Sequence, residues 1–284
     1  MLIPGCKVSV FACTDIGKRR SGNEDAFMVA DLTTGNWGLG PAMRTHQAGE
    51  RGTLLAVSDG MGGAVAGEVA SKMAVDFIYQ DLMSANTQAS DYENLILATH
   101  RANKQIRDYA IQHPEFHGMG ATLTAALVQD GKAYISQIGD SRAYLMRGKQ
   151  IKQLTRDQSL VQQLIDAGVI SEKDADRVPK NVILQALGVE PAVEVVMTTV
   201  DICRGDYLLL CSDGLSNKVT AEEMAHVLQT AISLPSACRS LVDLANERGG
   251  EDNITVVVAQ FDGEALLPAC HCPEPQYVKT RLVA

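Results

Sequence analysis

The most constraining feature of this 284-residue sequence is a series of short apolar segments, each of strand length and each ended by a turn. Glycine and acidic residues recur in these turns, which favours β-strands at those positions. The predicted strands are Val8–Cys13, Phe27–Ala30, Thr53–Ser58, Ala121–Val128, Lys132–Ile138, Arg142–Met146, Val193–Val200, Asp206–Cys211 and Ile254–Phe261. The sequence therefore predicts a fold built on β-sheets.

Helical periodicity appears between these strands. Apolar side chains recur at helical spacing in Ala66–Met83, Leu95–Ile111, Ala221–Ala231 and Ser236–Glu247. Two shorter and more polar helices, Ser159–Ala167 and Ser171–Asp176, are expected on either side of Gly168. Their polarity predicts a mobile excursion on the surface.

The connections between the strands lead to further expectations. Phe27–Ala30 is expected to return from the first strand as a hairpin, and Gly35–Gly52 is expected to be a surface loop. Turns at Asp130-Gly131 and Gly139-Asp140 predict a three-stranded antiparallel meander. Prolines interrupt the pattern near the end, so residues 263–284 are predicted to form a flexible tail outside the core.

Composition narrows the class of partner. The net charge is -9, the sequence pI is about 5.2, and no local basic patch is apparent, so a nucleic-acid partner is not expected. The apolar runs are far shorter than the ~20 residues that cross a bilayer, and the first ten residues lack the pattern of a signal peptide. The sequence thus predicts a cytoplasmic protein without a membrane segment.

Acidic residues gather at the predicted strand ends. Asp59, Asp140, Asp213 and Asp252 each lie where an apolar strand meets a turn, and Glu24-Asp25 lies close to another strand end. Carboxylates at one edge of a sheet repel each other unless a cation lies between them. Since no histidine or cysteine pair has suitable spacing nearby, oxygen ligands favour Mg²⁺ or Mn²⁺ over Zn²⁺. Each aspartate alone could be a turn residue, but the repeated placement favours a metal site.

Six groups of residues follow one another along the chain in a characteristic order. They are Asp15-Ile16-Gly17 with Arg20-Ser21-Gly22-Asn23-Glu24-Asp25, Val57-Ser58-Asp59-Gly60-Met61-Gly62-Gly63, Gly118-Met119-Gly120-Ala121-Thr122, Gly139-Asp140-Ser141-Arg142-Ala143-Tyr144, Ser212-Asp213-Gly214-Leu215 and Glu251-Asp252-Asn253-Ile254-Thr255. In this order they resemble the type 2C metal-dependent protein phosphatases, most closely the bacterial single-domain members, over about residues 8 to 262. An ordered set of this kind is far more specific than one motif.

The resemblance implies an α+β fold, a four-layer α-β-β-α sandwich of two antiparallel sheets flanked by helix pairs. It assigns residues 1–262 to a phosphatase catalytic domain, with a flap subdomain at about 155–184 and a C-terminal tail at 263–284. The flap is expected to influence substrate choice, although a plain surface helical hairpin is an equally simple interpretation.

The resemblance also implies a centre with two Mn²⁺ or Mg²⁺ ions. Asp59 would bridge the two metals, and Gly60 would offer its backbone carbonyl to one of them. Asp213 and Asp252 would hold the other metal. Asp140, together with Asp213, matches a weaker third-metal site seen in bacterial members.

The remaining implied roles belong to the segment around residue 20. Glu24 and Asp25 would act mainly through metal-bound water, and Arg20 would bind the substrate phosphate because its planar fork suits two phosphate oxygens. Without the motif, an arginine in a solvated turn would be the simpler interpretation of Arg20. The implied reaction is in-line attack of a metal-bridging hydroxide on phosphoserine or phosphothreonine of a protein.

Two positions depart from the family pattern. Met61 stands where many eukaryotic relatives have a histidine proposed as general acid, and Gln158 stands where family members often have histidine. Leaving-group protonation must therefore come from another group. A cysteine-based mechanism is disfavoured because Cys203 and Cys211 lie in or beside strands, and Cys270-His271-Cys272 is expected to be unstructured rather than a metal site.

Two alternatives remain open. One is a different two-metal phosphoesterase that acts on a small molecule, although the sequence carries no nucleotide-binding loop of Walker type. The other is a pseudoenzyme that only binds a phosphorylated partner, which loss of Asp59, Asp213 or Asp252 would have indicated. The expected partners are phosphorylated proteins, including a serine/threonine kinase and its targets, and the protein is expected to be a monomer.

Overall fold

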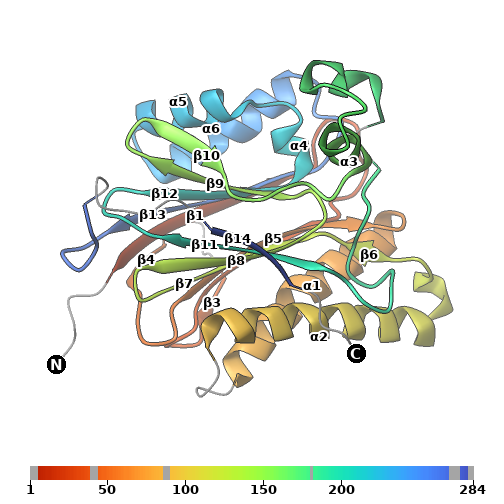
Figure 1. Cartoon of the computed structure of the whole chain (residues 1–284), viewed down its shortest axis with the longest axis horizontal. Coiled ribbons are helices and arrows are strands. Elements are labelled where there is room, and N and C mark those ends of the chain that lie inside the picture. Colours follow the sequence, from red (N-terminus) through yellow and green to blue (C-terminus); the bar gives the residue numbers. More distant parts are fainter. Residues whose placement is uncertain (1–5, 39–43, 86–89, 180–181, 269–275, 281–284) are drawn as a thin grey trace.

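The computed structural model describes residues 6–38, 44–85, 90–179, 182–268 and 276–280. Two antiparallel β-sheets lie face to face, and helices cover the outer face of each sheet (Figure 1). The predicted α+β sandwich of four layers is confirmed.

The first sheet has the strand order β10-β9-β12-β13-β1-β4 among the described residues. Its strands are β1 Lys7–Asp15, β4 Arg44–Gln47, β9 Arg142–Arg147, β10 Gln150–Gln153, β12 Tyr207–Cys211 and β13 Ile254–Asp262. The second sheet has the order β14-β11-β8-β7-β5-β2-β3, and a short β6 pairs with β5. Its strands are β2 Asp25–Asp31, β3 Asn36–Trp37, β5 Thr53–Met61, β6 Gly120–Ala121, β7 Leu123–Gln129, β8 Lys132–Ile138, β11 Val195–Asp201 and β14 Gln276–Thr280.

Two pairs of long helices form the outer layers. Helices α1 (Ala64–Ser84) and α2 (Asp91–Gln112) pack on the second sheet, and α5 (Ala221–Thr230) and α6 (Leu234–Glu247) pack on the first (Figure 1). Four short helices complete the described elements: η1 Pro114–Phe116, α3 Leu160–Asp166, η2 Glu172–Arg177 and α4 Asp213–Ser216. The predicted helices are thus found, and the second helix of the flap region is a 3₁₀-helix.

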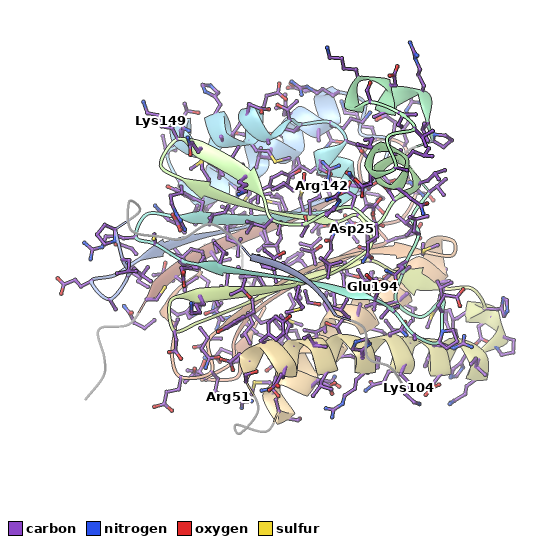
Figure 2. All side chains as sticks on the ribbon, in the orientation of Figure 1. Asp25, Arg51, Lys104, Arg142, Lys149 and Glu194 are labelled. Carbon is purple, nitrogen blue, oxygen red and sulfur yellow. The ribbon has the colours of Figure 1, made fainter. Side chains whose placement is uncertain are left out.

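Alternation along the strands places the core in three layers. In β1, Val8 and Val10 are fully buried between the two sheets, whereas Phe11 faces α6 in the helix-covered layer. Successive side chains of a strand point to opposite faces, so a strand covered on both faces is apolar at nearly every position. Charged side chains such as Lys104 and Lys149 lie on the outside, and Asp25 lies between the layers (Figure 2).

Two predicted strand pairings are wrong. The strands β1 and β2 do not form a hairpin, because β1 pairs with β13 and β4 whereas β2 pairs with β5 and β3 in the other sheet. The predicted meander stops after β8, since β9 crosses to the first sheet and pairs with β12 and β10. Both crossings occur at the turns that carry the acidic motifs.

Two segments contain more regular structure than predicted. The expected loop Gly35–Gly52 contributes β3 and β4, and β4 forms an edge of the first sheet. The expected tail contains β14, which pairs antiparallel with β11 from Val195↔Thr280 to Thr199↔Gln276. Cys270-His271-Cys272 lies outside the described residues.

None of the described helices combines the length and the apolar character needed to cross a membrane.

Candidate metal centre

The acidic residues predicted from the sequence meet at one end of the sandwich. Asp25 begins β2 and is paired in register with Asp59 near the end of β5. Asp213 begins α4 directly after β12, and Asp252 precedes β13, the neighbour of β12. Asp140 lies in the turn between β8 and β9. The chain crossings between the sheets therefore bring five carboxylates to one place.

Asp59 lies at the centre of this group. Burial is the main cause that raises the pKa of Asp59 well above its usual value, and Asp25, Asp213, Asp252 and Asp140 add to the rise by repulsion. Such a shift means that the negative charge of Asp59 is unfavourable without a positive neighbour.

The other carboxylates share this environment. Burial raises the pKa of Asp25 to about 7 and that of Asp140 to about 8, and in each case Asp213 contributes repulsion. Burial, followed by repulsion from Asp252, also raises the pKa of Asp213. The group therefore holds more negative charge than its surroundings compensate, which is the electrostatic condition for binding a cation.

Two oxygen atoms in this group are buried without a hydrogen-bond partner, Asp25 Oδ1 and Asp213 Oδ1. The second oxygen of each side chain is satisfied: Asp25 Oδ2 accepts from Ser212 Oγ at 2.7 Å and Asp213 Oδ2 accepts from Asn217 Nδ2 at 3.0 Å. An unpaired buried oxygen costs about 1–3 kcal/mol. Unpaired carboxylate oxygens fit the hard oxygen ligands that Mg²⁺ and Mn²⁺ prefer.

The carboxylates do not yet form a finished coordination shell. Within the described part of the chain, no group of three or more acidic, histidine or cysteine side chains could hold a metal ion as it stands. Mutual repulsion keeps like charges apart. Small side-chain movements toward a cation would therefore be needed to complete the site.

Arg20 and Glu24 lie at the edge of the group. The Arg20 guanidinium donates to Asp252 Oδ2 at 2.8 Å and lies 3.9 Å from Glu24 Oε1, while 47% of its side chain is exposed. Arg20 is therefore both accessible and held beside the predicted metal ligands.

Gly60 lies where two backbone segments approach closely. Its N–H donates to Glu24 O at 3.0 Å, and a Cβ at this position would lie 2.0 Å from the carbonyl oxygen of Gly67 in the first turn of α1. No other residue fits without separating β5 from α1. Its predicted role as a carbonyl ligand stays a prediction.

Asn253 is the first of two residues whose role the sequence interpretation missed. Its side chain is buried, accepts from Glu24 N at 2.8 Å, and donates to Ile16 O at 2.9 Å and Gly22 O at 3.0 Å. Asn253 thus fixes both ends of the loop that carries Arg20. The only sequence signal was its place after Asp252 in the motif.

Thr122 is a second missed residue. Its Oγ1 accepts from Asp59 N at 2.9 Å, and its backbone N–H donates to Asp59 O at 2.8 Å. The same hydroxyl lies 2.7 Å from Ser141 Oγ, next to Asp140. Thr122 therefore links the backbone of the central aspartate to the turn that carries Asp140.

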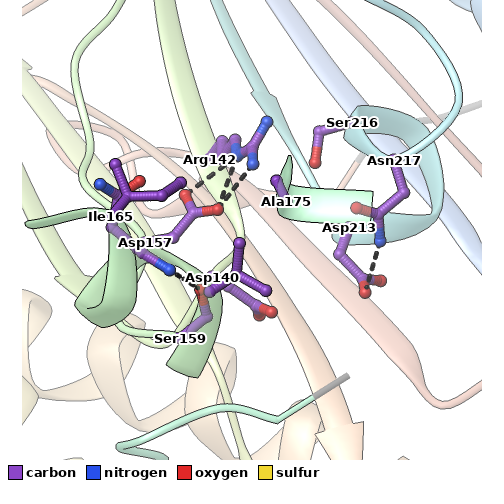
Figure 3. A pocket seen from close by; sticks show the side chains of 11 residues that line it. Asp140, Arg142, Asp157, Ser159, Ile165, Ala175, Asp213, Ser216 and Asn217 are labelled. Carbon is purple, nitrogen blue, oxygen red and sulfur yellow. Dashed lines mark hydrogen bonds and ion pairs between the residues drawn. The ribbon is translucent and has the colours of Figure 1, made fainter. Parts of the chain in front are cut away.

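A cavity of about 270 Å³ opens beside the carboxylates, between α3 and α4. Asp140 and Asp213 line one part of it, and Arg142 and Asp157 form an ion pair on its wall (Figure 3). Asp140 is only 8% exposed. The cavity places the predicted flap directly against the predicted metal ligands.

Cys203 and Cys211 lack the features of a catalytic nucleophile. Cys211 is fully buried, and burial raises its pKa to about 12. Cys203 is buried and disulfide-bonded. Neither residue offers the accessible thiolate that a cysteine-based mechanism requires.

Known proteins share this fold and sequence pattern. The family model described as protein phosphatase 2C matches residues 42–246. The serine/threonine phosphatase stp of Listeria monocytogenes is 42% identical over 214 residues, which cover 74% of this chain and 84% of that protein. The crystal structure of the Mycobacterium tuberculosis serine/threonine phosphatase PstP/Ppp superposes with a TM-score of 0.76 at 34% identity and covers 90% of this chain and 99% of that chain. A catalytic-domain structure of PstP in complex with 2 manganese ions gives a TM-score of 0.75 at 33% identity, with 90% and 99% coverage.

The chain belongs to the protein phosphatase 2C family. The predicted enzyme class, a metal-dependent serine/threonine protein phosphatase that acts on phosphorylated proteins, is confirmed.

Proposed function

We propose that this protein hydrolyses phosphoserine and phosphothreonine at a centre of two Mn²⁺ or Mg²⁺ ions held by Asp59, Asp213 and Asp252, with the backbone carbonyl of Gly60. The observation that carries the assignment is the pair of buried, unpartnered oxygens on Asp25 and Asp213 within a group of mutually repelling carboxylates. The two manganese ions in the related PstP structure support the stoichiometry.

The outer ligands complete the proposal. Glu24 and Asp25 lie beside the central aspartates and would act mainly through metal-bound water. Asp140 shares the cavity wall with Asp213, so the two would hold a weaker third cation. When bound, the cations supply an activated water and offset the charge on the phosphoryl oxygens.

Arg20 would bind the substrate phosphate. Its guanidinium already points to Asp252, and almost half of the side chain is exposed to an approaching dianion. A planar guanidinium can donate to two phosphate oxygens at once. Because Asn253 fixes both ends of the loop, the backbone that carries Arg20 is held in place.

The leaving serine or threonine oxygen must be protonated, and position 61, where many eukaryotic relatives have a histidine, carries Met61 instead. This side chain is 36% exposed at the end of β5 and carries no proton to transfer. We assign the proton to a water of the site rather than to a side chain. A pH–rate profile without a histidine-like inflection near ~6.5 would agree with this assignment.

The test is hydrolysis of a phosphothreonine peptide in EDTA, Mg²⁺ or Mn²⁺ by the wild type and by Asp59→Asn and Asp213→Asn. Asp243→Asn, an exposed aspartate on α6, is the matched control. We expect activity that requires added metal, is lost in both site variants and is retained by the control. An inactive wild type that still binds the phosphopeptide in Mn²⁺ would favour the pseudoenzyme instead. Preference for a nucleotide over the peptide would favour the small-molecule phosphoesterase.

The biological setting belongs to the same proposal. We propose a cytoplasmic monomer that reverses the action of a serine/threonine kinase, with a kinase and its targets among the substrates, and with residues 155–184 acting as the flap of a catalytic unit at 1–262. Phosphoproteome comparison of wild-type and Asp59→Asn cells, with cell fractionation and light scattering, would test these points.

A further inference from the structure

We infer that Asp157 and Gln158, near the N-terminal end of the flap, are positioning residues. They fix Asp140 and couple its position to the flap. The inference rests on the proposed function, in which Asp140 holds the weaker third cation. Position 158 departs from the family pattern because it carries a glutamine, and this glutamine contacts the turn that carries Asp140.

Gln158 forms two hydrogen bonds with Gly139, the residue before Asp140. Gly139 N donates to Gln158 Oε1 at 2.7 Å, and Gln158 N donates to Gly139 O at 2.9 Å. Gly139 has φ 92°, and a Cβ there would lie 2.7 Å from Thr122 Cγ2. The turn is therefore held between Gln158 on one side and Thr122 on the other.

Asp157 forms an ion pair with Arg142, which lies two positions after Asp140. The Arg142 guanidinium donates from Nε to Asp157 Oδ1 at 2.9 Å and from a terminal nitrogen to Asp157 Oδ2 at 2.6 Å (Figure 3). The side chains are only 26% and 11% exposed, so solvent screens this forked pair little. Two adjacent flap-base residues thus hold both sides of the Asp140 turn.

The same glutamine reaches the other base of the flap. Its Nε2 donates to Glu194 O at 3.1 Å, just before β11, and its backbone carbonyl accepts from Leu184 N at 2.7 Å. The side chain of Gln158 therefore joins the Asp140 turn to the segment before β11, and its backbone carbonyl holds the far end of the flap at Leu184. A displacement of the flap base would pull on the turn that orients Asp140.

The chemistry of its side-chain amide explains how Gln158 can bond to Gly139 and Glu194 at the same time. An amide offers an acceptor and a donor at the same time, and it does not change protonation between pH 5 and 9. Protonation therefore disturbs neither side-chain contact of Gln158 over this pH range. Substitution of a residue that orients a metal ligand without itself contacting the metal typically changes metal affinity about 10–100-fold.

The experiment uses the full chain with Gln158→Leu and Gln158→Asn. Leucine removes both amide contacts, whereas asparagine keeps an amide that is one methylene too short to span Gly139 and Glu194. Gln163→Leu, an exposed glutamine on the helix α3 that follows Gln158, is the control. The readouts are Mn²⁺ binding by calorimetry and electron paramagnetic resonance, hydrogen exchange over residues 159–179, and the melting temperature.

We expect both Gln158 variants to bind the weakest Mn²⁺ about tenfold less tightly, to keep the tighter affinities within about twofold, and to exchange faster over the flap. The control should match the wild type. A lower melting temperature with unchanged Mn²⁺ affinities and unchanged flap exchange would reduce Gln158 to a structural residue and overturn the inference. A wild type with only two Mn²⁺ sites would overturn it while leaving the two-metal function intact, whereas a wild type that binds no Mn²⁺ would refute the proposed function.

Discussion

Removing the charge of Asp25 is expected to stabilise the metal-free protein and to weaken its stabilisation by Mn²⁺. Asp25 Oδ1 is buried and unpartnered, while Oδ2 accepts from Ser212 at 2.7 Å. Burial, partly offset by the hydrogen bond from Ser212, raises its pKa from 3.8 to about 7. An asparagine keeps the size of the side chain and an acceptor for Ser212, but it carries no charge that needs a cation.

The magnitude follows from the pKa shift. One pKa unit corresponds to about 1.4 kcal/mol, so a rise from 3.8 to about 7 corresponds to about 4 kcal/mol at most. The repulsion is shared with Asp59, whose pKa is raised in part by Asp25. We therefore expect Asp25→Asn in EDTA at pH 8 to raise the free energy of unfolding by about 1–4 kcal/mol.

The same shift sets the sign of the pH dependence. Between the unfolded pKa near ~4 and the folded pKa of about 7, the folded wild type holds a proton that the unfolded chain has lost. Unfolding then releases this proton, so the stability that is fully present below pH ~4 is lost as the pH rises through the folded pKa, by up to about 1.4 kcal/mol per pH unit. Asp25→Asn should show a shallower decline.

Urea unfolding followed by circular dichroism at pH 5 and pH 8, in EDTA and in Mn²⁺, measures these quantities. Asp243→Asn is again the exposed control and should behave as the wild type. Mn²⁺ should raise the midpoint of the wild type strongly and that of Asp25→Asn much less. The reasoning is refuted if Asp25→Asn is less stable than the wild type in EDTA at pH 8, or if it keeps the full Mn²⁺ shift.

Three further substitutions test other parts of the structure. Asn253→Ala leaves one buried and two part-buried backbone groups without their partner, so it should cost about 1–3 kcal/mol in urea unfolding and raise KM for a phosphopeptide. Arg147→Met should cost about 3–5 kcal/mol, because it leaves the buried carboxylate of Asp206 without the guanidinium 2.8 Å away, while kcat of the folded enzyme stays unchanged. Gly60→Ala should abolish Mn²⁺ binding in calorimetry, because its Cβ would lie 2.0 Å from Gly67 O.

Matched controls separate these effects from general damage. Asn36→Ala, an exposed residue of β3, should be near neutral. Arg248→Met breaks a solvent-accessible pair with Glu223 and should cost much less stability than Arg147→Met. Gly118→Ala adds a Cβ in open space at φ 80°, so it should add modest backbone strain and keep Mn²⁺ binding. Equal losses in a variant and its control would contradict the stated cause.

The strands and helices could be predicted from local patterns because burial acts on each element directly. The nine-residue strand β1 and the amphipathic helix α2 follow from apolar spacing, and α2 also begins with a capping box between Ser90 and Glu93. The acidic strand ends and the ordered motifs identified the family, and through it the sandwich and the carboxylates of the site.

Strand pairing could not be predicted in the same way. An apolar strand is compatible with either sheet, since its pattern records which faces are buried and not which neighbour accepts its hydrogen bonds. The hairpin expected between β1 and β2 failed for this reason, and so did the meander through β9. These two crossings bring Asp25 and Asp140 to the centre.

The sequence by itself determined the family, because carboxylates, an arginine and glycines in that order form its motifs, and it predicted through them which residues would carry the chemistry. Only the tertiary structure decided how they are held: Asn253 fixes the Arg20 loop, and Gln158 joins the flap to the Asp140 turn. Those roles depend on hydrogen bonds between segments far apart in the chain. Such bonds form only after the two sheets have packed, and therefore leave no local pattern in the sequence.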